Sequence, residues 1–220
     1  MISGPDLVLG CPHCNALGKL FTLESLDPRG AITWSDGWQD APMMPRPPRI
    51  TRCPACAKIF WTWEAHQLGY APPAEIATPE QTAWLAAPHL EPLDAAGVAE
   101  AIASGLAPSP DLEMELRVLR WWRGNDQFRR TDAPVGHATD DDSIANMERL
   151  IVIMENGEED LLLFRAEVQR ELGRFEDALR TLDGVCCSDW WPAKSKMLAF
   201  IEARSRKLDV LFEAPPVEPA

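Results

Sequence analysis

The chain has 220 residues, of which 46% are hydrophobic and 25% charged, as in an ordinary globular protein. Its formal net charge is −13, and residues 71–220 carry all of it, since residues 1–70 hold six basic and six acidic side chains. No apolar stretch reaches the roughly 18 residues of a membrane-spanning helix, so we do not expect this chain to be an integral membrane protein. The negative charge of residues 71–220 would repel phosphates and therefore disfavours a general nucleic-acid-coating role for that part.

The six cysteines form three close pairs, at positions 11 and 14, 53 and 56, and 186 and 187. The first residues lack the basic start and the apolar run of a secretion signal, because Pro5 and Asp6 interrupt them. Without such a signal, close cysteine pairs favour metal binding over disulfides. We therefore expect a cytoplasmic protein with no membrane partner.

Two Cys-Pro-x-Cys units lie in the first part of the chain, one formed by Cys11 and Cys14 and the other by Cys53 and Cys56. Two residues between the cysteines let both sulfurs of one tight turn point at a single ion. Two such turns supply four soft ligands in a tetrahedron, which is the preferred shell of structural zinc. The sequence therefore predicts one structural zinc ion per chain, with an iron centre of the same geometry or a thiol redox pair as alternatives.

Other polar residues near the cysteines have expected roles as well. His13 lies inside the first unit and His66 follows the second, and with four thiolates available we expect both to face solvent. Lys19, Arg52 and Lys58 lie close to the cysteines in sequence. We expect them to offset part of the negative charge that four thiolates leave on a dication.

This constellation of four cysteines and two prolines resembles the zinc-ribbon (rubredoxin-like) family over residues 6–66. The resemblance implies a small β domain organised by the metal. The chain departs from the pattern at Asn15 and Ala57, where many ribbons carry glycine because the backbone turns left-handed. The spacer between Cys14 and Cys53 is also long, at 38 residues.

The spacer and its flanks predict the strands of this domain. Extended, apolar segments predict strands over residues 17–23, 31–35, 50–52 and 58–63. Asp36-Gly37 is a two-residue hairpin signal that makes Ser35 face Trp38. The proline-rich segment 42–48 cannot donate to a strand ladder and is expected to be an extended loop.

Aromatic and basic residues of this part suggest a possible contact surface. Trp61 and Trp63 alternate along the last predicted strand and are expected on one face. Arg46, Arg49 and Arg52 recur every three residues. They fit either a nucleic-acid contact or a solvated loop that balances the thiolates, and the neutral charge of residues 1–70 favours the loop.

The Ala-Pro-Pro-Ala segment at 71–74 is typical of a linker. It divides the chain into a zinc-ribbon domain, residues 1–70, and an acidic helical domain, residues 75–214. Helices are expected to start at Thr78 and Ser109, because each is followed by a proline at the first helical position.

Further helices follow from spacing. Ile144, Met147, Ile151 and Met154 recur at helical intervals, and Asn156-Gly157 closes that pattern. The three aspartates at 140–142 fit a helix N-terminus better than a calcium loop. A last helix is expected over residues 192–211, followed by a frayed tail at 214–220.

Residues 158–186 predict two antiparallel helices joined at Gly173. Between Ala166 and Leu182, the positions of Gly173, Phe175 and Ala178 resemble one tetratricopeptide (TPR) repeat. A generic helical bundle is the alternative, because no second copy occurs 34 residues away in either direction.

The chain as a whole resembles bacterial proteins that join a Cys-knuckle ribbon to TPR-like helices. The two Cys-Pro-x-Cys units and the Trp-Trp-Arg-Gly-Asn-Asp sequence at 121–126 carry this resemblance. It implies an architecture and no reaction. The expected fold class is therefore α+β, a small N-terminal β zinc ribbon followed by an all-α domain with a TPR-like hairpin.

Two more features of the second part bear on chemistry. Cys186 and Cys187 are expected to be small buried residues at a helix end, with a redox switch as the alternative. In the tryptophan pairs, 121–122 and 190–191, we expect one member to enter the bundle and the other to cover a seam with the next helix or the ribbon. The alternative is a partly exposed tryptophan that anchors a partner, and for that role the first pair is the better candidate. It lies between two cations, and the candidate surface comprises Arg120, Trp121, Trp122 and Arg123.

These observations favour a non-catalytic zinc-binding adaptor that uses its helical domain to bind a protein partner. The alternative is a nucleic-acid-associated factor that makes contact through the ribbon only. An enzyme is the least favoured class, because four thiolates leave the metal no open position for water and no catalytic motif occurs in the sequence.

Overall fold

The computed structural model describes most of the chain. The described residues are 2–129, 136–155, 157 and 159–215. Within these ranges, no helix combines the length and the apolar character that crossing a membrane requires.

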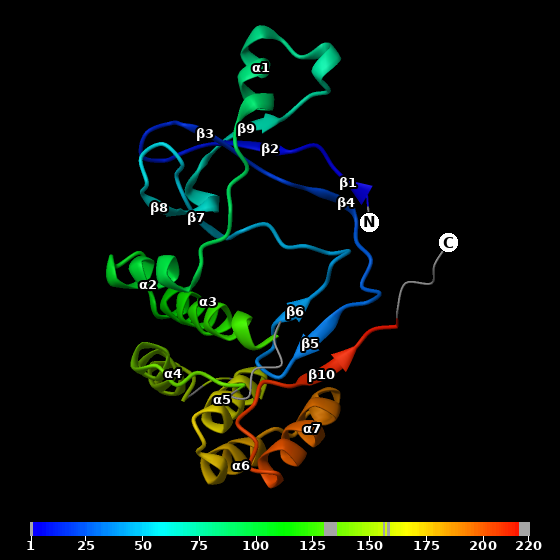
Figure 1. The fold of residues 1–220 in the computed structure, drawn as a ribbon, viewed down its shortest axis with the longest axis vertical. Coiled ribbons are helices and arrows are strands. Elements are labelled where there is room, and N and C mark those ends of the chain that lie inside the picture. Colours follow the sequence, from blue (N-terminus) through cyan, green and yellow to red (C-terminus); the bar gives the residue numbers. More distant parts are fainter. Residues whose placement is uncertain (1, 130–135, 156, 158, 216–220) are drawn as a thin grey trace. The chain divides into compact units, whose positions relative to one another are not determined.

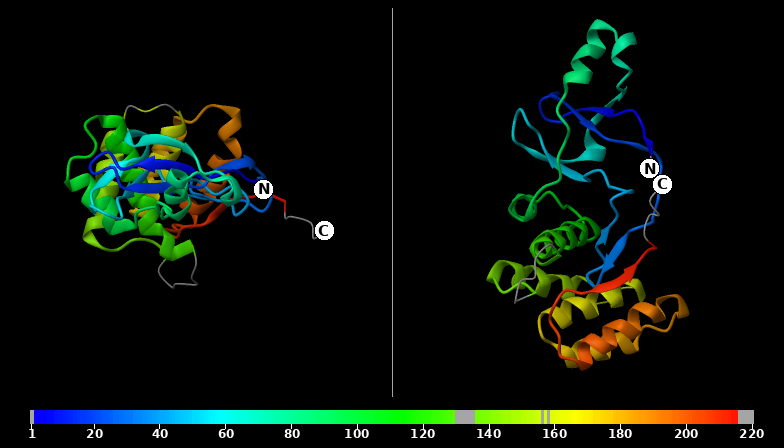
Figure 2. Two further views of the ribbon diagram at one scale, coloured as in Figure 1. Left: turned by 90° about the horizontal axis from the view of Figure 1, so that it is seen from above. Right: turned by 45° about the vertical axis from the view of Figure 1, so that its right-hand side comes forward.

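The chain forms two compact units, whose elements are drawn in Figures 1 and 2. Unit 1 contains residues 2–30 and 41–94, and unit 2 contains residues 31–40 and 95–215. This division differs from the expected one of 1–70 and 75–214, because a short segment of the cysteine spacer belongs to the helical unit and the residues after the linker stay with the cysteines.

Unit 1 is built from short antiparallel strands. One sheet has the order β3-β2-β9, and two further pairs are β1-β4 and β7-β8. The strands are β1 (Ile2–Ser3), β2 (Leu7–Gly10), β3 (Leu17–Leu20), β4 (Leu23–Ser25), β7 (Ile50–Arg52), β8 (Ile59–Trp61) and β9 (His66–Tyr70). The predicted strand over 17–23 is thus two strands, and the prediction over 50–52 is confirmed.

Residues 75–94 belong to unit 1 because they complete its core. Helix α1 (Pro79–Ala86) begins at the predicted Thr78, whose side chain forms a capping box with Gln81. The chain then returns to β3, where the Leu90 N–H donates to the Lys19 carbonyl over 2.9 Å. Leu90 is buried in the cluster that also holds Leu9 and Phe60.

Unit 2 contains six α-helices among the described residues, and a short 3-10 helix (Ser188–Trp190) precedes the last of them. The α-helices are α2 (Ala95–Ala103), α3 (Pro110–Arg129), α4 (Asp141–Ile153), α5 (Glu159–Glu171), α6 (Phe175–Asp183) and α7 (Trp191–Glu202). The predicted starts of α3 and α4 are confirmed, and Asp140 caps α4 by accepting from the Ser143 N–H. The alanine-rich α2 has no counterpart among the predicted elements.

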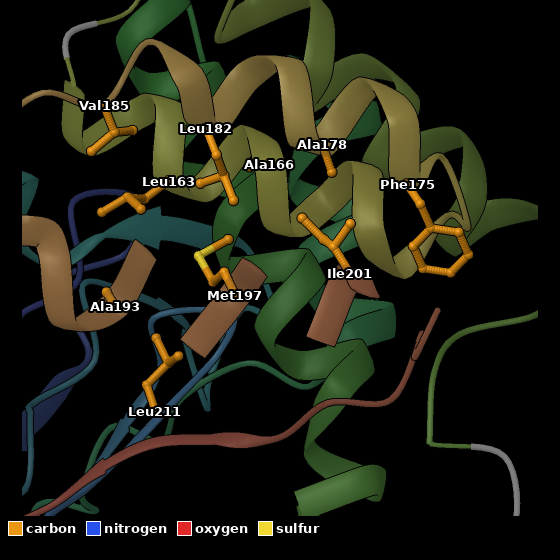
Figure 3. Close-up of a cluster of buried hydrophobic side chains, with 10 residues drawn as sticks. All are labelled: Leu163, Ala166, Phe175, Ala178, Leu182, Val185, Ala193, Met197, Ile201 and Leu211. Atoms are coloured by element: carbon orange, nitrogen blue, oxygen red, sulfur yellow. The ribbon is translucent and has the colours of Figure 1, made fainter. Parts of the chain in front are cut away.

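Helices α5 and α6 form the predicted hairpin at Gly173. Gly173 has a φ of 80°, and the Arg174 N–H donates to the Gln169 carbonyl over 2.8 Å, which closes α5 in a Schellman motif. Figure 3 shows side chains of α5, α6 and α7 pointing toward one another in a shared apolar cluster. That cluster includes Ala166, Ala178, Leu182, Met197 and Ile201.

Unit 2 also contains a sheet, so the expectation of an all-α domain is wrong. Its order is β10-β5-β6, with β5 (Ile32–Trp34), β6 (Gln39–Asp40) and β10 (Val210–Glu213). The predicted last helix ends at Glu202, where Arg204 adopts a φ of 47°, and residues 210–213 pair with β5 instead. The structure is therefore mixed, with helices and small antiparallel sheets.

The hairpin between β5 and β6 has a three-residue loop in place of the predicted two-residue one. The Trp34 N–H donates to the Trp38 carbonyl over 2.9 Å, so Trp34 faces Trp38 and Ser35 does not. Gly37 takes a φ of 78°, and the Asp36 carboxyl accepts from the Trp38 N–H over 3.0 Å. The left-handed glycine lengthens the loop by one residue and shifts the register accordingly.

Candidate metal centre

The two Cys-Pro-x-Cys units fold into matching turns, called knuckles below. β2 leads into Cys11 and β7 leads into Cys53. In the first knuckle the Cys11 N–H donates to the Ala16 carbonyl, and in the second the Cys53 N–H donates to the Lys58 carbonyl, each over 2.9 Å. The two knuckles therefore present their sulfurs in the same way from two different pairs of strands.

The fifth residue of each knuckle has a left-handed backbone. Asn15 has a φ of 60° and Ala57 a φ of 61°, and their N–H groups donate to the carbonyls of Cys11 and Cys53. These are the two positions where the resemblance to zinc ribbons leads one to expect glycine. Asparagine tolerates this conformation, whereas alanine is strained in it.

The four thiols converge on one point. The Sγ atoms of Cys11, Cys14, Cys53 and Cys56 all lie within 4.8 Å of one another. The Cys11–Cys56 sulfur distance is 3.9 Å and the Cys14–Cys53 distance is 3.6 Å. A tetrahedron with metal–sulfur bonds of about 2.3 Å has edges of about 3.8 Å, close to these two distances, so the four thiols lie near the arrangement that a four-coordinate metal ion requires.

Burial differs between the two cysteines of each knuckle. Cys11 and Cys53 are buried in the apolar cluster of unit 1 and touch its core residues Leu9 and Phe60. Cys14 lies at the surface. A metal bound here would join the core of the unit to its exposed edge.

Backbone N–H groups and neighbouring thiols shape the acidity of the site. Burial acts to raise the pKa of Cys53, but backbone N–H donors, that of Cys56 first, lower it to about 7. The Ala16 N–H acts to lower the pKa of Cys14, but neighbouring thiols, that of Cys56 first, raise it to about 12. Four thiols this close cannot all ionise by themselves, so a cation is needed to hold four thiolates together.

Histidines and basic residues near the knuckles do not join the thiol group. His13 and His66 are exposed, as expected. Lys19 pairs with Asp6 at 3.1 Å, whereas Arg52 donates to the Ala57 carbonyl at 3.0 Å and so braces the second knuckle. In the part of the chain that the structure describes, no second group of three or more His, Cys, Asp or Glu ligand atoms comes this close together.

The structure decides the burial of a tryptophan pair and a cysteine pair in the helical part. Trp121 is 3% exposed and packs with Met147 and Val168, as expected for the member of the pair that enters the bundle, so it is not the exposed anchor of the alternative. Cys186 and Cys187 follow the end of α6 and are exposed, not buried.

The remaining candidate partner residues are also engaged within unit 2. Trp122 is half-buried and donates its indole N–H to the Asp36 carbonyl over 2.8 Å. Arg123 pairs with Asp126 at 3.1 Å, and Arg120 is partly buried. The exposed tryptophans of the unit are instead Trp190 and Trp191, at 41% and 61%.

A buried polar network in unit 2 was not foreseen from the sequence. Asp36, Asn125 and Glu171 are at most 1% exposed, and the Asn125 amide donates to both carboxyl groups. Arg129 pairs with Asp36. The residues come from three separate segments, and no local motif marks them.

Comparisons of the chain with protein-family models, with curated proteins and with solved structures find no match.

Proposed function

We propose that the chain is a non-catalytic adaptor, in which unit 1 is built on one structural zinc ion and unit 2 binds a protein partner. The observation that carries the zinc assignment is the convergence of four thiol sulfurs within 4.8 Å. Four thiolates in a tetrahedron suit zinc better than harder cations and fill its coordination shell. Such a metal stabilises a fold and has no open position for a reacting water.

A structural role also matches the size of unit 1. Its sheets have two or three short strands each, which are marginal without further support. The metal would connect β2 and β3 to β7 and β8, because each strand pair carries one knuckle. Binding energy at such a site becomes folding energy.

The partner-binding role rests on the helical hairpin. We assign α5 and α6 to a TPR-like pair, supported by the left-handed turn at Gly173 and by the burial of Ala166, Phe175 and Ala178 between the helices. Helical pairs of this kind present surfaces to peptides. We also propose a cytoplasmic location, because none of the six described cysteines is in a disulfide and a reducing compartment keeps thiols in this state.

Metal analysis tests the first half of the proposal. Protein prepared anaerobically should contain about one equivalent of zinc by elemental analysis, and Cys53→Ser should lose both the zinc and the folded unit 1. The matched control is Cys186→Ser with Cys187→Ser, which removes two exposed thiols outside the site. Less than half an equivalent of zinc in the wild type, or an equivalent of iron, would overturn the zinc assignment.

Affinity capture from a native lysate tests the second half. The wild-type chain should retain a specific protein partner. The Cys186→Ser/Cys187→Ser control should retain the same partner. Failure to enrich any protein over a bare resin would contradict the adaptor role while leaving the zinc assignment standing.

A nucleic-acid role has one observation in its favour. Trp63 is 48% exposed and stacks on Trp61 with a ring-centroid distance of 4.2 Å, and the Arg49 guanidinium lies 5.2 Å from the Trp63 ring. An exposed aromatic ring beside a cation is a stacking platform for bases.

The distinguishing experiment is a mobility shift with single-stranded DNA and RNA at low and high salt. Salt-sensitive binding that Trp63→Ala removes would favour the nucleic-acid factor over the adaptor. Absence of a shift at low salt would exclude it.

A further inference from the structure

A groove of about 500 Å³ crosses the hairpin of α5 and α6, within unit 2. Three arginines line it, Arg165 from α5 and Arg174 and Arg180 from the region of α6. Asp177 is the one acidic residue among its lining residues. The groove therefore has a local charge opposite in sign to that of residues 71–220, which hold 15 basic and 28 acidic side chains.

Two of the three arginines make exposed ion pairs. Arg180 pairs with Asp177, and Arg174 pairs with Glu148; all four side chains are 39% exposed or more. Exposed ion pairs of this kind contribute between about 0 and 1 kcal/mol, so a ligand carboxylate can replace either acidic partner at little cost.

Arg165 has a hydrogen-bond donor that the described residues leave unused. One of its terminal nitrogens donates to the Glu155 carbonyl over 3.3 Å. Its Nε atom is buried and has no hydrogen-bond partner among the described residues. A buried guanidinium nitrogen without an acceptor is costly, so Arg165 has donor capacity beside the groove that the described residues leave unused.

The groove also has an apolar part. Ile151 of α4 and Leu162 of α5 line it beside the arginines. Leu162 packs against the core cluster of the hairpin, which fixes this part of the wall. The combination suits a ligand that presents carboxylates on one side and an aliphatic side chain on the other.

We propose that this groove binds an acidic peptide segment of a partner protein, with its carboxylates on Arg165, Arg174 and Arg180 and an aliphatic side chain against Ile151 and Leu162. The proposal rests on the adaptor function given above and names the class of partner. A long polyanion such as nucleic acid is disfavoured, because the net charge of −13 repels it beyond the groove. A short segment is affected less, since salt screens charges beyond about 8 Å.

The probe is a fluorescein-labelled hexapeptide with the repeat Glu-Glu-Leu, titrated with the zinc-loaded full chain by fluorescence anisotropy. We expect saturable binding that weakens as salt rises. The Arg174→Gln/Arg180→Gln variant should raise the Kd by about tenfold or more, the loss of roughly 1.4 kcal/mol. The matched control is Arg204→Gln, which removes an exposed arginine outside the groove that pairs with Glu176.

Matched peptides separate charge from apolar contact. A Gln-Gln-Leu repeat should bind at least about tenfold more weakly than the Glu-Glu-Leu repeat, and a Glu-Glu-Ser repeat should bind with intermediate affinity. The proposal is overturned if the Glu-Glu-Leu probe does not bind at about 1 mM, if the Gln-Gln-Leu probe binds equally, or if Arg204→Gln weakens binding as much as the double variant does.

Lysate capture with the same double variant separates this proposal from the adaptor function. If the Arg174→Gln/Arg180→Gln chain still retains the partner that the wild type retains, the adaptor function stands and the groove is not its site. If neither chain retains a partner while the peptide still binds, the groove stands as an anion-binding site and the adaptor function fails.

Discussion

The indole N–H of Trp121 donates to the carboxyl group of Glu171 over 3.1 Å, and both residues are buried in unit 2. The bond joins the middle of α3 to the last turn of α5. Asn125 donates to the same carboxyl group at 3.2 Å and to Asp36 at 3.0 Å. The pair thus belongs to a network that connects α3, α5 and the β5–β6 loop.

The network holds more acid than base. Asp36, Glu167 and Glu171 are buried acids, whereas Arg129 and Arg170 are the cations bonded to them. Burial raises the pKa of Asp36 to about 6 and raises that of Glu171 well above its usual value, the latter with a contribution from nearby Glu167. Burial therefore favours the protonated form of Glu171.

The first prediction concerns the pH dependence of stability. A carboxyl group with a raised folded-state pKa favours folding below its unfolded-state pKa, and that contribution is lost as pH rises toward the folded-state value. Glu171→Gln carries a neutral amide at every pH, so the variant does not lose this contribution. The free energy of unfolding of the variant minus that of the wild type should therefore be larger at about pH 8 than at about pH 5. Urea unfolding followed by circular dichroism measures this difference, and an equal difference at both pH values would mean that Glu171 is ionised in the folded protein.

A second prediction separates the two tryptophan pairs. Trp121→Ala should cost about 3–5 kcal/mol of unfolding free energy, because it opens a cavity beside Met147 and leaves a bond of Glu171 unmade. Trp191→Ala should change stability by no more than about 0.5 kcal/mol, since its side chain is 61% exposed. Thermal melts of both variants check the order, and equal losses would contradict the burial described for Trp121.

A third prediction concerns the segment 31–40. A fragment of residues 75–214 contains every helix of unit 2 but lacks β5 and Asp36, so β10 loses its partner strand and Arg129 its buried carboxylate. We expect this fragment to melt without cooperativity. A fragment of residues 31–215, which restores both groups, should show a cooperative helical transition by circular dichroism, and a cooperative melt of the shorter fragment would show that the segment is dispensable.

The fourth prediction uses the strained residue of the second knuckle. Ala57→Gly should raise stability by about 0.5–1 kcal/mol, because glycine adopts the φ of 61° without strain. Asn15→Gly is the matched change in the first knuckle and should gain less, as asparagine tolerates the left-handed region. Chemical denaturation of the zinc-loaded protein measures both, and a loss at Ala57→Gly would show that its methyl group contributes packing that outweighs the strain.

Local patterns predicted the parts of this structure that are formed locally. The cysteine spacing defines each knuckle within four residues, and the capping signals at Thr78 and Asp140 need only the next turn of helix. The pairing of β5 with β10 joins residues about 180 positions apart, such as Ile32 and Glu213. The sequence near either strand contains no signal that identifies the other strand as its partner.

The sequence also does not determine which side of a helix faces the core. Trp121 and Trp122 are neighbours on α3, and which of them enters the core depends on where α4 and α5 lie. Asp36 looked like a turn residue because it precedes glycine. Its burial against Asn125 and Arg129 depends on α3, which follows more than 70 positions later.

The interleaving of the two units along the chain has a consequence for how the protein can be taken apart. The chain passes between the units after residues 30, 40 and 94. No single peptide-bond cleavage divides the described chain into one fragment carrying all of unit 1 and another carrying all of unit 2. Genetic shuffling faces the same constraint, since a gene segment that carries both knuckles also carries the β5–β6 hairpin, and a segment that carries only the helices leaves that hairpin behind.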